Sequence, residues 1–156
     1  MISVSFAGNL LNYLNLIAIV NPFLCIMQTV RIPATATNPV YLVSLLRYKE
    51  YADYGNAAGS GPCSGRDIYF RRYVRAFKEI TAAEQVTLFF LGRVQAGWMA
   101  PEGEQWDEVV VMQYPDLASF RRITESAEYL AMAKPHLDAA LDDYRIIVTG
   151  GGKVTI

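Results

Sequence analysis

Histidine and cysteine are scarce in this sequence of 156 residues, which contains one histidine and two cysteines. The cysteines, Cys25 and Cys63, lack CxxC spacing, so neither a zinc site nor a disulfide framework is indicated. His136 stands alone, which excludes most histidine-based metal chemistry. We therefore predict no metal site and no cofactor. Because nothing depends on disulfides, a reducing, cytoplasmic location is expected.

Charged side chains are absent from Met1 to Val30, a segment long enough to span a membrane at ~20 apolar residues. Several asparagines interrupt it, and an Asn-Pro pair favours a helix boundary: Asn9, Asn12, Asn15 and Asn21-Pro22. A cleaved signal peptide would need basic residues before the apolar run. We predict that residues 1–39 form an apolar helical extension and linker that packs on the domain or its dimer mate. Membrane contact through residues 1–30 is the less favoured alternative.

The charge balance is close to neutral, with a formal net charge of -1 and an isoelectric point near 5.8. Arginines gather locally at Arg71, Arg72 and Arg75, but a solvated helix face is the preferred interpretation. Nucleic acid is therefore not an expected partner. Hydrophobic residues make up 53% of the chain, which is more than an ordinary soluble domain carries. Apolar surface beyond a single core needs a cover.

The pattern after residue 39 predicts one domain, residues 40–156. A β-branched, aromatic run at 40–47 is typical of a central strand, and Ser64-Gly65-Arg66-Asp67 has the capping-box pattern that begins a helix. A second helical region begins at Pro115-Asp116, breaks near Ser126 and restarts near Pro135. Three further strands are expected at 86–94, 106–114 and 145–149. This order of elements predicts an α+β, ferredoxin-like βαββαβ sandwich.

The strand at 106–114 is apolar on both sides. Val109 and Val111 alternate with Val110 and Met112, so neither face of the sheet suits water. Helices can cover one face, and a second copy of the sheet is the natural cover for the other. We therefore predict a homodimer joined through its sheets.

Several short stretches together resemble the DUF1330 family of dimeric α/β barrel proteins. They cover residues 40 to 149 and are Ser44-Leu45-Leu46-Arg47-Tyr48-Lys49, Ser64-Gly65-Arg66-Asp67-Ile68-Tyr69, Trp106-Asp107-Glu108, Tyr114-Pro115-Asp116 and Ala139-Ala140-Leu141-Asp142-Asp143. The sequence departs from the family pattern at Ser44, where asparagine is usual, and near Glu84-Gln85, where a glycine is often found. The resemblance implies the ferredoxin-like fold and dimerisation. Its wider superfamily includes cofactor-free monooxygenases, cyclases and isomerases.

Two groups are candidates for acid–base chemistry. Asp107 follows Trp106 at the start of an apolar strand, where a carboxylate can have a raised pKa and exchange protons. His136 is the second candidate, and both have structural alternatives: a strand-end aspartate held by an arginine or backbone amides, and a histidine satisfied at the edge of the core. The candidate ligand-binding residues are Arg47, Tyr69, Tyr73, Trp106 and Tyr129.

Two classes of function remain open from the sequence. The first is a cofactor-free enzyme of isomerase, cyclase or monooxygenase type acting on a small apolar or aromatic molecule. The second is a non-catalytic dimeric module that binds a ligand or another protein. A perturbed carboxylate in an enclosed pocket would favour the enzyme, and a filled core would favour the module.

Overall fold

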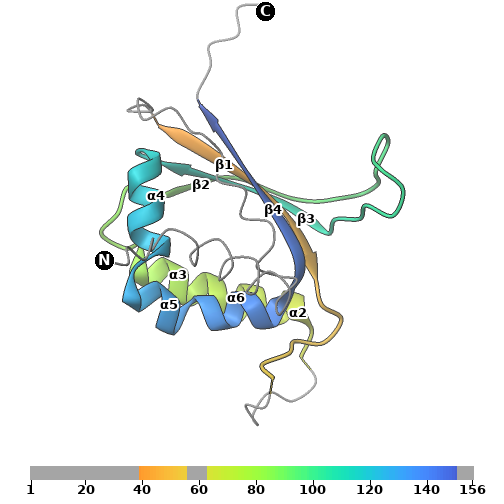
Figure 1. Cartoon of the computed structure of the whole chain (residues 1–156), viewed down its shortest axis with the longest axis horizontal. Coiled ribbons are helices and arrows are strands. Elements are labelled where there is room, and N and C mark those ends of the chain that lie inside the picture. Colours follow the sequence, from red (N-terminus) through yellow and green to blue (C-terminus); the bar gives the residue numbers. More distant parts are fainter. Residues whose placement is uncertain (1–38, 56–62, 151–156) are drawn as a thin grey trace, which may run out of the picture. The chain divides into compact units, whose positions relative to one another are not determined.

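The computed structural model describes residues 39–55 and 63–150 as a four-stranded antiparallel sheet with helices packed on one face (Figure 1). The strand order is β2-β3-β1-β4. The strands are β1 (Val40–Tyr48), β2 (Thr87–Arg93), β3 (Glu108–Tyr114) and β4 (Leu141–Gly150). The helical segments are α2 (Gly65–Ile68), η2 (Tyr69–Tyr73), α3 (Val74–Ile80), α4 (Leu117–Thr124), α5 (Ala127–Met132) and α6 (Lys134–Ala140). The predicted ferredoxin-like α+β fold is confirmed.

Side chains cap α2, α4 and α5 where the sequence predicted that these helices begin. The Ser64 hydroxyl accepts a hydrogen bond from the Asp67 N–H at 3.1 Å, and α2, η2 and α3 continue from it as one rod. The Asp116 carboxylate accepts from the Ser119 N–H at 2.6 Å and starts α4. The Ser126 hydroxyl accepts from the Tyr129 N–H at 3.1 Å and starts α5. Each cap satisfies a backbone donor that has no partner within its helix.

The last strand is longer than the sequence pattern indicated. It begins at Leu141 rather than at residue 145, and α6 ends at Ala140. β4 pairs with the whole of β1, from Leu141 opposite Tyr48 to Gly150 opposite Val40. An ion pair of 2.6 Å joins Arg47 to Asp142 where this pairing begins. Pairing with a central strand therefore overrides the helical pattern in this part of the sequence.

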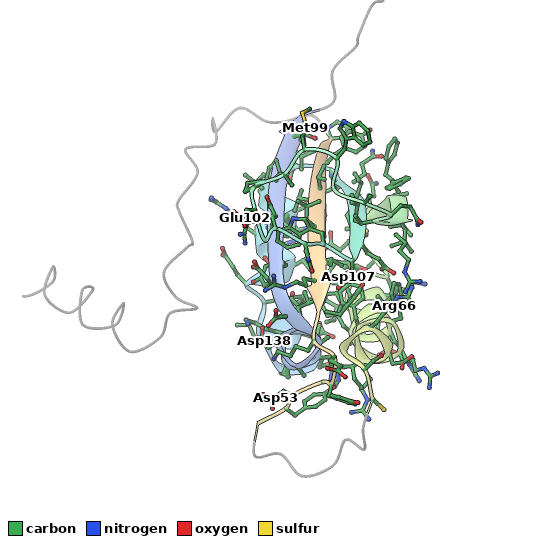
Figure 2. The ribbon with its side chains drawn as sticks, turned by 90° about the vertical axis from the view of Figure 1, so that its right-hand side faces the viewer. Asp53, Arg66, Met99, Glu102, Asp107 and Asp138 are labelled. Atoms are coloured by element: carbon green, nitrogen blue, oxygen red, sulfur yellow. The ribbon has the colours of Figure 1, made fainter. Side chains whose placement is uncertain are left out.

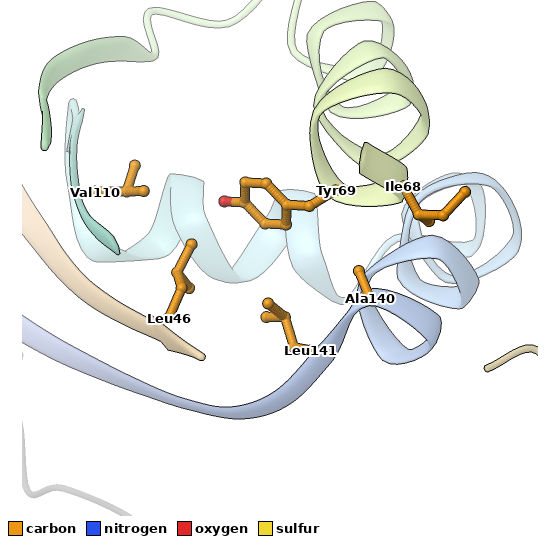
Figure 3. Packing of buried hydrophobic residues seen from close by; sticks show 6 residues of the cluster. All are labelled: Leu46, Ile68, Tyr69, Val110, Ala140 and Leu141. Atoms are coloured by element: carbon orange, nitrogen blue, oxygen red, sulfur yellow. The ribbon is translucent and has the colours of Figure 1, made fainter. Parts of the chain in front are cut away.

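The core lies between the sheet and the helices. Alternate residues of β1 and β3 face the helices, and the most buried include Val40, Leu42, Leu46, Val110 and Tyr114. Figure 3 shows one cluster, in which Leu46 and Val110 of the sheet meet Tyr69 and neighbouring residues of the helical layer. Full burial of side chains of this size contributes about 1.5–3 kcal/mol each.

The opposite face of the sheet is also apolar. The register places Tyr41, Val43 and Leu45 on this face, together with their cross-strand partners Val109, Val111 and Ile147. On β2 a register shift between Leu88 and Phe90 marks a bulge, and Phe89 packs edge-on against Tyr41 at 5.1 Å. Phe89, Phe90 and Ile147 are 65%, 51% and 52% exposed. We call this side of the sheet, which carries Phe89, Phe90 and Ile147, the outer face.

No helix within ranges 39–55 and 63–150 is long and apolar enough to cross a membrane. The extension predicted over residues 1–39 lies, apart from Pro39, outside the described residues. The boundary between extension and domain stays a prediction.

Gly65 lets the first helix approach two other backbone segments. Its N–H bonds the Lys49 carbonyl at 3.0 Å, and the Lys49 N–H bonds the Ala140 carbonyl at 2.9 Å. A Cβ at Gly65 would collide with the Ala140 carbonyl oxygen and lie 2.6 Å from that of Lys49. The backbone must therefore move if any side chain is placed there.

We expect Gly65→Ala to lower the free energy of unfolding by about 1–3 kcal/mol, because overpacking against backbone cannot be relieved by a rotamer change. Urea denaturation followed by circular dichroism measures this. Gly97→Ala is the control, since its Cβ would meet only the Ala100 side chain at 3.7 Å. Equal stability of the two variants would contradict the packing argument.

Candidate functional site

A buried carboxylate lies where β3 begins. Glu108 is 2% exposed, because it shares the helix-facing side of β3 with Val110. Its Oε1 accepts hydrogen bonds from Nε and Nη2 of Arg66 at 2.9 and 2.7 Å. Its Oε2 accepts from the Tyr48 hydroxyl at 2.8 Å. A buried charge is costly unless it is paired and hydrogen-bonded, and here both oxygens have partners.

Arg66 closes this cluster toward solvent. Its side chain is about half exposed, and its guanidinium stacks on the Phe70 ring at 4.7 Å from the ring centre. The close approach of Gly65 to Lys49 and Ala140 holds the start of α2, and thereby Arg66, beside the sheet. Charge-assisted bonds of this kind are about twice as strong as neutral ones. Three elements, α2, β1 and β3, therefore meet at one carboxylate.

Buried tyrosines extend from the carboxylate into the core. Tyr48 packs edge-on against Tyr69 at 5.4 Å, and Tyr69 lies 5.0 Å from Tyr73. Burial, and then the hydrogen bond to Glu108, raises the pKa of Tyr48 above its usual value. Burial is also the main cause that raises the pKa of Tyr69, Tyr73, Tyr114 and Tyr129. The phenols therefore stay protonated and act as donors. In Figure 3 the hydroxyl of Tyr69 points toward Val110 of the sheet.

Asp107, the first predicted catalytic residue, lies next to this cluster but points elsewhere. Its Oδ2 accepts a 2.7 Å hydrogen bond from the backbone N–H of Tyr48. Its own N–H bonds the Leu46 carbonyl at 2.7 Å, and its carbonyl accepts from the Val94 N–H at 2.9 Å. Figure 2 labels Asp107 near Arg66, which bonds the adjacent residue Glu108. Asp107 is an exposed strand-end carboxylate that fixes the backbone of Tyr48.

His136, the second predicted catalytic residue, has different neighbours. Its Nδ1 is 2.7 Å from the Tyr54 hydroxyl, and it lines a hollow of about 450 Å³ with arginines of the first helix. Burial and then the charge of Arg72 lower its pKa. Asp107 does not line that hollow, so the structure does not bring the two predicted groups together. Within the ranges that the structure covers, no three His, Cys, Asp or Glu side chains are grouped to hold a metal ion.

Two of the predicted ligand-binding residues line a second hollow, of about 310 Å³. Arg47 and Trp106 lie there with Arg145, whose guanidinium is 5.1 Å above the Trp106 ring. The indole N–H bonds Glu104 at 3.0 Å. The other three predicted residues, Tyr69, Tyr73 and Tyr129, belong instead to the packed helical layer. The predicted set therefore divides between a surface hollow and the interior.

Sequence reasoning missed Glu108, Arg66 and Tyr48 as a group. Their separations along the chain are 42 residues for the ion pair and 60 for the tyrosine bond, so no local motif joins them. One signal was present: Glu108 stands two residues before Val110, which places it on the same side of the strand.

The family model for a domain of unknown function, DUF1330, matches residues 66–150. The chain belongs to the DUF1330 family. The matched region includes Arg66 and Glu108, and it ends with β4. The chain matches none of the curated proteins with which it was compared.

Solved structures of similar fold include RPA0582, a protein of unknown function from Rhodopseudomonas palustris. It is 24% identical, with a TM-score of 0.66 over 76% of this chain and 85% of that protein. Methylated RPA0582 is likewise 24% identical, with a TM-score of 0.65 over 74% and 82% of the two chains. This similarity supports the fold. A DABB family protein with a ferredoxin-like fold from Mesorhizobium loti is more distant, at 15% identity and a TM-score of 0.45 over 74% and 98% of the two chains.

Arg66→Leu should lower the free energy of unfolding by about 2–3 kcal/mol, because it leaves a buried carboxylate without its cation. The value lies below the usual range for fully buried pairs since Arg66 is half exposed to solvent. Chemical denaturation tests this, with Arg71→Leu as a control whose 79% exposed side chain makes only a long ion pair. The double variant Arg66→Leu/Glu108→Gln should recover much of the loss, since no buried charge remains and the amide oxygen can still accept from the Tyr48 hydroxyl. A double variant less stable than either single variant would contradict this account.

Proposed function

We propose that the domain is a cofactor-free enzyme that moves a proton on a small, largely apolar or aromatic molecule, with Glu108 as the proton acceptor. The observation that carries the proposal is a carboxylate 2% exposed, next to protonated phenols. A carboxylate within hydrogen-bond reach of a substrate proton can act as a general base.

The hydrogen-bond inventory of Glu108 leaves room for a proton. A carboxylate offers about four lone-pair sites, and Arg66 and Tyr48 occupy all but one, at Oε2. In an isomerase-type reaction Glu108 takes a proton from a carbon beside a carbonyl, which leaves an enolate. The protonated Glu108 then donates a proton, either the abstracted one or one exchanged with solvent, to a different carbon, so no oxidant or reductant is needed. The Tyr69 hydroxyl is suited to stabilise the enolate oxygen.

The predicted residues take supporting parts in this proposal. Asp107 positions Tyr48 through the backbone hydrogen bond, and Tyr73 and Tyr129 continue the row of phenols next to Tyr69. Arg47 and Trp106 lie at the second hollow, which Glu102, Glu104 and Asp143 also line. A direct catalytic role for Asp107 or His136 stays a prediction, which the proton-exchange assay described below can test.

We also propose that two copies associate through their outer faces. The support is the exposure of Phe89, Phe90 and Ile147 on a sheet face that the helices leave uncovered in the described part of the chain. Contiguous exposed apolar patches are typical of protein interfaces. Around a two-fold axis, the outer face of one copy would cover the same face of the other.

The second candidate function is a non-catalytic dimeric binding module. A specific observation favours it: two apolar clusters pack between the sheet and the helices and a third packs among the helices, and the two hollows lie elsewhere. A ligand would then bind at the hollow of Arg47 and Trp106. The two candidates differ in one outcome: substitution of Glu108 should abolish turnover if the domain is an enzyme.

Glu108→Gln should lower the rate of proton exchange at least about 100-fold, because the amide cannot accept the proton. The assay incubates a panel of small aryl and cyclic ketones with the protein in deuterated water and follows carbon-bound hydrogen by NMR. Asp107→Asn is the matched comparison and should lower the rate less, because the amide oxygen can still accept the hydrogen bond from the Tyr48 N–H. Equal rates for the wild type and Glu108→Gln would remove the enzyme proposal and leave the binding module.

Phe89→Ser/Phe90→Ser should weaken self-association at least about tenfold, since about 1.4 kcal/mol of lost apolar burial has that effect. Sedimentation equilibrium at micromolar concentration measures it. Tyr51→Ser is the control, because Tyr51 is 61% exposed and lies in the loop after β1, away from the sheet. A wild-type domain that stays monomeric at this concentration would rule out the proposed dimer.

A further inference from the structure

The hollow of about 450 Å³ beside His136 lies between the first helical rod and the α5–α6 region. Arg71, Arg72, Arg75, Glu79, Met132 and His136 line it. Two of the arginines come from η2, a π-helical segment. Single π-helical turns within a helix occur frequently at functional sites. The hollow is open to solvent rather than an enclosed cavity.

The charges around this hollow do not balance. Three arginines line it against one glutamate, and that glutamate pairs with Arg75 at 3.2 Å. Arg71 has only a 3.7 Å ion pair with Asp67. Arg72 forms no ion pair with any described carboxylate, and its guanidinium instead stacks 5.7 Å from the centre of the Tyr54 ring. The lining therefore carries an excess of positive charge.

His136 is held in a fixed orientation in this positive environment. The Tyr54 hydroxyl meets its Nδ1 at 2.7 Å, and the two rings pack edge-on at 5.7 Å. The same tyrosine therefore orients both Arg72 and His136. Among neighbouring charges on α6, Lys134 and Asp138 pair with each other at 2.6 Å. The Nε2 atom of His136 remains as a polar atom for a ligand.

We propose that this hollow binds the oxyanion of a small molecule, a phosphate or a carboxylate, through the guanidinium of Arg72 with support from Arg71 and His136. A guanidinium matches the geometry of both oxyanions, and stacking on Tyr54 orients it before the ligand arrives. This site shares no residue with the Glu108 cluster, so it holds whether or not the proposed proton transfer is correct.

The chain provides its own probe, because His136 is its only histidine. Its imidazole proton signals in the NMR spectrum are followed across pH with rising inorganic phosphate, and separately with benzoate, at constant ionic strength set by sodium chloride. A bound anion favours the imidazolium, so it should raise the pKa that burial and Arg72 now lower. A rise of one pKa unit corresponds to about tenfold tighter binding to the protonated form.

Arg72→Gln is the test variant, and Arg121→Gln, an exposed arginine of α4, is the control. We expect a saturable phosphate- or benzoate-dependent shift in the wild type and the control, and its loss in Arg72→Gln. Each variant is compared with its own anion-free titration, because removing Arg72 by itself raises the His136 pKa. Which anion saturates at lower concentration identifies the class. A shift linear in concentration, or one that survives Arg72→Gln, would overturn the site. Binding of duplex DNA without any phosphate or benzoate response would overturn it as well.

Discussion

The charge of Glu108 inside the domain is the constraint on which the surrounding structure depends. A carboxylate at this depth must have a cation and a second donor within hydrogen-bond distance, and Arg66 and Tyr48 supply them from different elements. The first helix must therefore begin beside the sheet. The absence of a side chain at Gly65 permits that approach, and the chain of backbone bonds through Lys49 and Ala140 maintains it. The end of β1, the start of the first helix and the end of α6 are thus joined at one place.

Local patterns explain how much of the fold the sequence could predict. The apolar run of β1 and the caps at Ser64, Asp116 and Ser126 depend on neighbours only a few residues apart, and the structure agrees with them. The start of β4 depends on a partner strand about a hundred residues earlier. Leu141 continues the apolar pattern of α6, so periodicity alone extends the helix across it. Pairing with Tyr48 decides the boundary instead.

The candidate site illustrates a different limit. The sequence drew attention to Asp107, and the buried carboxylate is its neighbour Glu108. Successive residues of a strand face opposite sides of the sheet, so a difference of one position separates a solvent-exposed group from an interior one. The periodicity of β3 contains enough information to place Glu108 inward. It cannot identify Arg66 as the partner of Glu108, because Arg66 reaches the carboxylate only when the first helix packs on the sheet.

The bulge at Phe89 has a consequence for how copies of this chain can meet. In the described part of the chain, β2 is one edge strand of the sheet and β4 is the other. An edge strand offers backbone groups to which another molecule can add a strand. The extra residue interrupts the regular spacing of those groups, and it also turns Phe89 and its neighbour Phe90 toward the same face. Strand addition at the β2 edge is thereby disfavoured, while the two exposed phenyl rings favour stacking of sheet faces. At this edge, one inserted residue suits the sheet to the face-to-face pair proposed above rather than to an open fibre.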